Sequence, residues 1–444
     1  MSLSCLPAFL ATCFLRLGRF LDPRVARRLP LLLLGILYAS GRRTATAWFR
    51  AAGIGAHFRQ AYHAIYAVGR RASFLAGNVF YAAFRTRLQP LPRLVFALDD
   101  TPTARYGPHV QGAGIHRDPS PGPGGSAWLY GHVWVTLAWL GRHARWGTLA
   151  LPLLANLYVR AKDVAKLPKH YDWQFRTKLT LAVELLHRVL GWVKTLGKAV
   201  WIVADGGYAK KEFLRAARAA HVTVVSRLRK DAALWTVPPT VRRPGQRGPL
   251  PTYGATRIEL AKRAGQRRGW QRVRCVQYGA TVTKTLKTFL ATWVPAGGVI
   301  RVVLVREVHG WVAFFCTDPQ ATATDILELA ADRSAIEQTF NDLKEVWGAG
   351  QQQLRNVYAN IGAWHLNLWS HALVEWWAWD EPDEALVDRS GSPWDREERR
   401  PSHADKRRAV QRRAVAQELG GLVAAGTDVA EIVAWAEARW RRLA

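Results

Sequence analysis

The sequence predicts a mixed α/β protein with one central sheet and helices on both of its faces. Hydrophobic residues make up 49% of the 444 residues, which is enough to bury a substantial core. Between residues 93 and 226, β-rich and helical runs alternate in the order three strands, helix, strand, helix, strand. Acidic side chains stand at the ends of two of the β runs. These observations together indicate a sheet core that carries a carboxylate site.

The composition is strongly basic. Lys and Arg number 63 against 33 Asp and Glu, which gives a formal charge of +30 and a pI near 10.8. A charge of this size attracts polyanions over long range and loses its effect as salt is added. Nucleic acid is therefore the favoured partner, with an anionic membrane surface as the alternative. The hydrophobic content excludes a disordered polycation.

The cysteines and the apolar runs bear on the compartment. The four cysteines are Cys5, Cys13, Cys275 and Cys316. Their spacing fits neither a metal site nor a secreted disulfide scaffold, so we interpret them as reduced thiols inside a cell. The longest apolar runs, at 29–39 and 148–159, have about half of the ~20 residues that a transmembrane helix needs. We expect a cytoplasmic protein without a membrane span.

The first 90 residues form a basic region that we expect to be helical and to bind DNA. They contain thirteen Arg, no Lys and one acidic residue. Residues 31–40 are predicted to form a helix that ends at Gly41, and Arg42 and Arg43 precede a second helix up to residue 52. This pattern is typical of a helix-turn-helix, which would place Arg42 and Arg43 against DNA. An ordinary helical hairpin with a solvated Arg face fits equally well.

The first part of the core is predicted at 91–228. Its strands are expected at 93–98, 132–140, 146–159, 199–204 and 222–226, with helices at 178–196 and 210–220. This succession is that of a ribonuclease H-like core. The first and fourth strands of such a core are neighbours. Asp100 and Asp205, each just past the end of a β run, are therefore expected to lie close together.

Residues 229–318 are predicted to form a basic β insertion into this core. Between residues 227 and 274 there are thirteen Lys and Arg against two acids, and β runs are expected at 271–278, 281–294, 301–308 and 311–316. The second part of the core is assigned to 319–379. A helical tail follows at 380–444. Two interpretations of it are equally good: a helix that supports dimerisation, and a solvated basic tail.

A long helix predicted at 321–347 carries three charged residues on one stripe. Arg333, Glu337 and Lys344 fall at i, i+4 and i+11, next to the apolar stripe that packs on the sheet. Arg333 and Glu337 alone would also fit a surface ion pair worth ~0.3–0.5 kcal/mol. A functional role becomes the better interpretation when Glu337 is considered together with the two aspartates.

Asp100, Asp205 and Glu337 are the candidate catalytic and metal-binding residues. Ligands that are all oxygen suit Mg²⁺ or Mn²⁺, which complete their coordination shells with water and substrate phosphate. Two such ions would activate the attacking oxygen and stabilise the leaving oxygen at a phosphorus centre. Arg333 and Lys344 are then expected to hold the DNA phosphate backbone.

Three strings carry a resemblance to a known family: LDDTPTARYG around Asp100, VADGGYAKKEF around Asp205, and DRSAIEQTFNDLK. They resemble the DDE transposases of the insertion-sequence-four superfamily, in its IS-seven-zero-one-like branch. The signature of that superfamily is Tyr-xx-Arg-xxx-Glu-xxxxxx-Lys, and the arginine, glutamate and lysine of the third string match it. Ala330 stands where the signature has tyrosine. If the strand continues, Asp99 and Asp100 point to opposite sides, so only one of them can be a ligand, and the resemblance favours Asp100.

The resemblance implies cut-and-paste DNA transposition near the nucleoid of a bacterium. Two Mg²⁺ or Mn²⁺ ions per site would support cleavage at the transposon ends, a hairpin intermediate, and strand transfer into target DNA by a homodimer. Trp270 or Trp293 of the insertion is a candidate stacking surface, although a core role is the commoner one for such residues. The alternatives are an endonuclease without strand transfer and a catalytically silent DNA-binding derivative.

Overall fold

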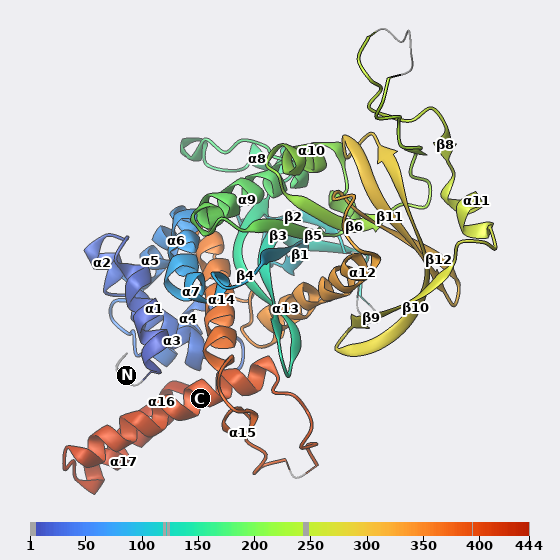
Figure 1. Ribbon diagram of the computed structural model, residues 1–444. Helices are drawn as coiled ribbons and strands as arrows, with labels where there is room; N and C mark the ends of the chain where they lie inside the picture. Colours follow the sequence, from blue (N-terminus) through green and yellow to red (C-terminus); the bar gives the residue numbers. More distant parts are fainter. Residues whose placement is uncertain (1–5, 119–120, 122–124, 243–247, 393, 444) are drawn as a thin grey trace.

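The computed structural model describes residues 6–118, 121, 125–242, 248–392 and 394–443 (Figure 1). Cys5 lies outside these residues, and the three described cysteines are free and buried. Within the described chain, no helix combines the length and the apolar character needed to cross a bilayer. Figure 1 shows the N-terminal helices and the C-terminal helices on one side of the central strands, and the strands after residue 229 on the other side.

Twelve strands of the described chain join in one sheet, in the order β2-β3-β1-β5-β6-β12-β11-β10-β7-β8, with β4 paired to β3 and β9 paired to β10. Their bounds are β1 Arg93–Ala104, β2 Gly114–Arg117, β3 Trp128–His143, β4 Gly147–Tyr158, β5 Ala199–Ala204, β6 Thr223–Leu228, β7 Leu234–Trp235, β8 Arg257–Ile258, β9 Gln271–Gln277, β10 Ala280–Trp293, β11 Gly298–Glu307 and β12 Gly310–Cys316. Strand β1 is antiparallel to β3 and parallel to β5, which is parallel to β6. The predicted mixed α/β class is confirmed, and the strand order is consistent with a ribonuclease H-like core.

The α-helices of the described chain are α1 Ala8–Gly18, α2 Pro23–Ala26, α3 Leu29–Tyr38, α4 Ala45–Ala52, α5 Phe58–Arg70, α6 Ala72–Val79, α7 Arg85–Leu88, α8 Ala161–Val164, α9 Lys178–Val193, α10 Lys211–Ala219, α11 Leu260–Gly265, α12 Ala323–Asp332, α13 Ser334–Glu345, α14 Val357–Ala378, α15 Asp383–Leu386, α16 His403–Ala424 and α17 Val429–Leu443. Helix α9 packs on β3 and β4, and α13 packs on β1 and β4. The one helix expected at 321–347 is two helices, because α12 ends and α13 begins on either side of Arg333.

The strands expected as an insertion extend the core sheet. Strand β12 pairs antiparallel with β6, with Ala313 opposite Leu228 and Cys316 opposite Val225. The backbone hydrogen bonds of the core therefore continue through β12, β11 and β10 without a break. The β9–β10 hairpin then folds back toward α12, where the backbone N–H of Val276 donates to Glu328 at 3.0 Å.

The N-terminal helices share one hydrophobic core with the sheet. Helices α5 and α14 cross at two glycines, where a side chain would not fit. A Cβ atom at Gly69 would lie 1.8 Å from the carbonyl oxygen of Tyr358, and one at Gly362 would lie 1.9 Å from that of Ile65. Close packing of this kind makes the first 90 residues part of the same folded unit as the core.

Helix α4 is too buried to be a recognition helix. The predicted hairpin is present, with Gly41 in a left-handed turn and Thr44 as the N-cap of α4. Of the eight residues of α4, only Thr46 and Arg50 are exposed. A helix that enters a major groove must present its side chains to the bases. The structure therefore favours the ordinary helical hairpin.

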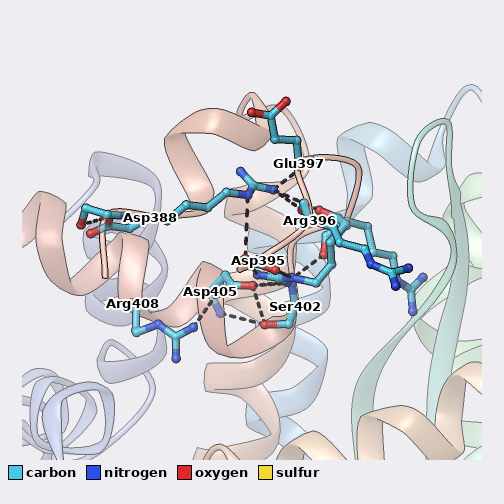
Figure 2. Close-up of polar contacts among 11 residues, drawn as sticks. Asp388, Asp395, Arg396, Glu397, Ser402, Asp405 and Arg408 are labelled. Carbon is cyan, nitrogen blue, oxygen red and sulfur yellow. Dashed lines mark hydrogen bonds and ion pairs between the residues drawn. The ribbon is translucent and has the colours of Figure 1, made fainter. Parts of the chain in front are cut away.

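The chain between α15 and α16 is held by a network of arginines and acids, which Figure 2 shows at the start of α16. The Arg399 guanidinium donates two hydrogen bonds of 2.7 Å to Asp395 and one of 2.7 Å to Asp405. Asp405 also forms a capping box with Ser402 and pairs with Arg408. Helix α16 continues from this point along α14 and α3. This long helix of the predicted tail is therefore packed on the body of the protein.

Candidate active site

Asp99 and Asp100 lie within strand β1, and not after its end as expected. The Asp-Asp-Thr-Pro string predicts the end of a strand. Strand β3, however, is long enough to pair with β1 as far as Ala104. Neighbouring residues of a strand point to opposite faces. Asp99 and Asp100 therefore face different helices, and only one of them can join Glu337.

Asp99 faces α13. One guanidinium nitrogen of Arg333 lies 2.5 Å from Asp99 Oδ2, and another lies 2.6 Å from Glu337 Oε1. Arg333 can reach both carboxylates because it sits between α12 and α13, one turn before Glu337. The acid on the strand and the acid on the helix thus share one half-buried guanidinium.

Asp205 stands beside Asp99, just past the end of the neighbouring strand β5. Strands β1 and β5 are parallel and pair Leu98 with Ala204, so the residues that follow, Asp99 and Asp205, are neighbours. Asp205 caps a short 3₁₀ turn, and its carboxylate accepts the N–H of Gly207 at 2.8 Å. Its side chain is exposed. The negative charge of Asp205 acts on both Asp99 and Arg333.

Asp100 points to the opposite face of the sheet, toward α9. Its two oxygens are engaged by Lys178 Nζ at 2.6 Å and by the hydroxyl of Tyr208 at 2.8 Å. This placement differs from the expectation that Asp100 joins Asp205 and Glu337. The physical reason is the continuation of β1, which fixes the alternation of side chains. The structure brings Asp99, Asp205, Glu337 and Arg333 together. It places Asp100 on the opposite face of the sheet, in contact with Lys178 and Tyr208.

The Asp99 carboxyl holds its proton more tightly than an ordinary aspartate. Burial raises the pKa of Asp99 to about 7, and the nearby charges of Asp100 and Asp205 add to this effect, while Arg333 opposes it. Burial alone would lower the pKa of Arg333, but the charges of Asp99 and Glu337 raise it overall. A buried carboxyl of raised pKa among other acids is typical of a functional site.

Lys344 and Arg42 both line a cavity near the end of α13. The cavity has a volume of 760 Å³ and lies between the end of β1, the end of α13 and the loop that follows α13. Lys344 is half-buried, and burial lowers its pKa. Arg42 is exposed at the rim. Lys344 lies two helical turns beyond Glu337 on the same helix, a distance of about 10 Å.

Arg43 has a different place from its neighbour. Its guanidinium donates to the carbonyl oxygens of Gly41 at 3.3 Å and Glu345 at 3.4 Å, and its backbone N–H donates to Gln351 at 2.9 Å. Burial lowers the pKa of Arg43. These contacts attach the N-terminal region to the end of α13, so the structure gives Arg43 an anchoring contact and does not present it to a ligand.

The two tryptophans considered for stacking are both occupied. Trp270 lies between Lys287, 4.9 Å from its ring, and Arg306, 4.6 Å from its ring. Trp293 is 8% exposed and packs edge-on against Phe315. The geometry favours the core interpretation for Trp293, and it makes Trp270 part of a packed cation–aromatic stack.

Comparison with known families identifies the superfamily. The family model for DDE superfamily endonucleases matches residues 17–285, more than half of the chain. This chain belongs to the DDE superfamily endonucleases. Among curated proteins, none matches it. The matched segment of this DDE endonuclease contains Asp99, Asp100 and Asp205 and ends before Glu337. The match supports a nuclease or transposase activity on DNA, and the insertion-sequence-four branch stays a prediction.

DDE endonucleases normally use divalent metal ions, and the donor atoms here suit such ions. Asp99, Asp205 and Glu337 offer only carboxylate oxygens, which Mg²⁺ and Mn²⁺ prefer. Arg333 occupies the space between two of them, and these acids do not form a group of three with all donor atoms within 4.8 Å of one another. The donor chemistry fits a divalent ion, provided that Arg333 moves away from the acids.

One other group of potential ligands occurs in the described part of the chain: His371, Glu375 and His403, all buried. His403 Nε2 accepts from Trp347 at 2.6 Å, so its Nδ1 carries the proton and donates to Glu375 at 2.6 Å. The second oxygen of Glu375 holds Lys406 at 2.6 Å. Both ring nitrogens of His403 and both oxygens of Glu375 already have partners, and the Lys406 ammonium supplies a positive charge. This cluster therefore fits a structural ion pair better than a metal centre.

Sequence reasoning missed Lys178 and Tyr208, which contact Asp100, and Arg105, which lines the cavity at the end of β1. Tyr208 follows Asp205 in the quoted string, and burial with the charge of Asp100 raises its pKa well above the ordinary value. Arg105 directly follows β1. The alternation that separates Asp99 from Asp100, if continued to residue 105, would have drawn attention to Arg105.

Proposed function

We propose that this DDE endonuclease is a DNA transposase, which cuts DNA at the ends of its element and joins those ends to target DNA. The observation that carries the proposal is the shared contact of Arg333 with Asp99 and Glu337, beside Asp205. It brings together one carboxylate within a central strand, one just past the end of the neighbouring strand, and one on a packed helix. The resemblance of the three strings to the IS-seven-zero-one-like branch supports strand transfer as the second step.

The proposed ligand set is Asp99, Asp205 and Glu337, with Asp99 in place of the Asp100 that the resemblance favours. Two Mg²⁺ or Mn²⁺ ions bound there would activate the attacking oxygen and stabilise the leaving oxygen at phosphorus. The protein's own part is to bind and orient the DNA. Arg333 and Lys344 are proposed to hold phosphates on either side of the cut, because both lie along the same face of α13.

The basic surfaces of the molecule support double-stranded DNA as the partner. The N-terminal 90 residues and the segment from 227 to 274 each carry thirteen basic residues. Arg42 lies at the rim of the cavity that contains Lys344. The hairpin intermediate and a homodimer in the DNA complex belong to this proposal, and they rest on the resemblance.

The test is incubation of the purified protein with Mg²⁺ and DNA that carries the terminal repeats of the element. Double-strand cuts with hairpin or joined products support a transposase. Nicks alone would instead indicate an endonuclease without strand transfer. A shift of the DNA on a gel without any cleavage would indicate a silent DNA-binding derivative.

The ligand assignment is tested in the same reaction with four variants. Asp99→Asn, Asp205→Asn and Glu337→Gln are expected to lower the cleavage rate by about 100-fold or more. Asp100→Asn is expected to keep cleavage, because its carboxylate contacts Lys178 and Tyr208 on the opposite face of the sheet. If Asp100→Asn abolishes cleavage and Asp99→Asn does not, the assignment is reversed.

A further inference from the structure

The cavity beyond Glu337 contains a buried arginine without an acidic partner. Arg105 is 6% exposed, and no carboxylate in the described chain pairs with it. Its guanidinium donates to the carbonyl oxygens of Ala104 and Gly350, and its Nε has no hydrogen-bond partner. Burial lowers the pKa of Arg105 to about 10. A buried cation is costly unless an anion compensates it, so an unpaired guanidinium at a cavity wall indicates an anionic ligand.

The backbone of the loop after α13 comes close to the guanidinium of Arg105. Gly350 has a φ of +107°, and a Cβ atom there would lie 2.9 Å from a guanidinium nitrogen of Arg105. Gln353 adopts a φ of 52°, which is uncommon for a residue with a side chain. Backbone strain of this kind is concentrated at ligand-binding and active sites. Both residues line the cavity.

The other lining side chains suit the phosphate and the base of a nucleotide. Lys344, Arg355 and Arg42 add three positive charges, against the single acid Glu345. Tyr106, which is 77% exposed, offers a ring face on which a base can stack. The amide of Gln353 offers a donor and an acceptor for a base edge.

The size and depth of the cavity decide between a duplex and a single strand. Its volume of 760 Å³ lies within the range of about 300–1,000 Å³ of small-ligand pockets. A duplex carries its phosphates on a convex surface and cannot bring one to a guanidinium that is almost fully buried. The distance of about 10 Å from Glu337 to Lys344 corresponds to about three nucleotides of a stacked strand.

We propose that this cavity binds unpaired nucleotides of the DNA strand that runs away from the carboxylates, with Arg105 holding a phosphate. The proposal rests on the proposed function in one respect, which is that DNA is the ligand. It adds a single-stranded subsite that recognises the strand on one side of the cut.

The experiment compares two fluorescent DNAs in EDTA: a blunt duplex and the same duplex with a short single-stranded extension. The wild-type protein is expected to bind the extended DNA about tenfold more tightly. Arg105→Met is expected to remove this preference and leave the affinity for the blunt duplex unchanged. The slope of log K against log salt for the extended DNA is expected to fall by about 0.7 for the phosphate contact that is lost.

Two further variants keep the test decisive. Arg355→Gln alters an exposed rim residue and is expected to reduce the same preference, even if Arg105→Met fails to fold. Arg188→Gln on α9 is the matched control, because this exposed arginine lies on a helix that packs on the other face of the sheet. Equal weakening of both DNAs by the cavity variants, or no preference in the wild-type protein, would overturn the proposal. Because no metal is present, this result is independent of whether the protein cleaves DNA.

Discussion

Arg333 gives the acidic cluster an internal cation. Its guanidinium contacts Asp99 and Glu337 at the same time, and the nearby charge of Asp205 strengthens its positive form. A divalent ion that binds these carboxylates must displace this guanidinium, and a DNA phosphate offers Arg333 an alternative partner. Metal binding and DNA binding are therefore expected to favour each other, as linked equilibria require.

Arg333→Ala is predicted to bind Mn²⁺ more tightly than the wild-type protein in the absence of DNA at pH 8. The expected gain is about tenfold, because the competing guanidinium is removed. Electron paramagnetic resonance measures free Mn²⁺ directly and gives the dissociation constant. Arg142→Ala is the control, since Arg142 pairs with Glu328 and Asp332 on α12 and not with the cluster. Unchanged or weaker Mn²⁺ binding by Arg333→Ala would contradict the displacement model.

The raised pKa of Asp99 predicts a pH-dependent stability. Folding raises this pKa from its ordinary value of 3.8 to about 7, so the folded protein binds the proton more tightly. The stability that this group contributes is complete below pH 3.8 and is lost as the pH rises through 7. Asp99→Asn removes the titration. The quantity to measure in EDTA is the melting temperature of Asp99→Asn minus that of the wild-type protein. This difference is expected to be several degrees larger at pH 8 than at pH 5.

A matched control separates this effect from general changes in charge. Asp231 is exposed and pairs with Arg229, so Asp231→Asn is expected to show no such rise over the same pH range. A flat difference between Asp99→Asn and the wild-type protein would show that Asp99 titrates as an ordinary aspartate.

The acidic residue types were predictable from the sequence, but their orientation was not. Asp205 and Glu337 lie where the residue order and the helical spacing placed them. The choice between Asp99 and Asp100 depends on where β1 ends, and this is decided by the length of β3, a tertiary partner that local sequence does not reveal. The cavity around Arg105 was not predicted either, because it requires the loop after α13 to return to the end of β1.

Single elements were predictable where their signals are local. Strand β5 has the expected bounds of 199–204, and β9 to β12 lie within a few residues of the expected runs. The division between α12 and α13 was not expected, since no Gly or Pro marks it. The closeness of α5 and α14 was also hidden, because two glycines far apart in the sequence make it possible.

The crossing of α5 and α14 gives a prediction at the scale of these elements. Gly362→Ala places a methyl group 1.9 Å from the Ile65 carbonyl oxygen, so the two helices must separate. A loss of about 1–3 kcal/mol in the free energy of unfolding is expected, measured by urea denaturation. Gly420→Ala in α16 is the control, since no atom lies within 4 Å of its added methyl group. This control is expected to be neutral or to stabilise by up to about 1 kcal/mol.

At the scale of the molecule, the described regions pack around a shared hydrophobic core, although charge patterns along the chain predict several separate regions. One hydrophobic core includes residues from the N-terminal helices, the sheet and α16. Arg407 of α16 donates to the carbonyl oxygens of Leu37 at 2.9 Å and Val346 at 2.6 Å, which joins the N-terminal region to the end of α13. Composition alone cannot show such contacts, because they join residues hundreds of positions apart.

The buried pair of Lys406 and Glu375 tests the role of α16 in this unit. Lys406→Met leaves Glu375 buried without its cation. Removal of one partner from a buried pair costs about 3–5 kcal/mol, which chemical denaturation would detect. Lys262→Met removes an exposed pair with Glu259 and is expected to have little effect. Similar small effects of both variants would mean that α16 is dispensable for the stability of the body.

The pairing of β12 with β6 has a mechanical consequence. A tension applied to the strands after residue 229 passes through backbone hydrogen bonds into β6 and then into β5, the strand that leads to Asp205. Each strand from β10 to β5 is hydrogen-bonded to the next along this path. A force on the outer strands is therefore expected to reach the strand that positions Asp205.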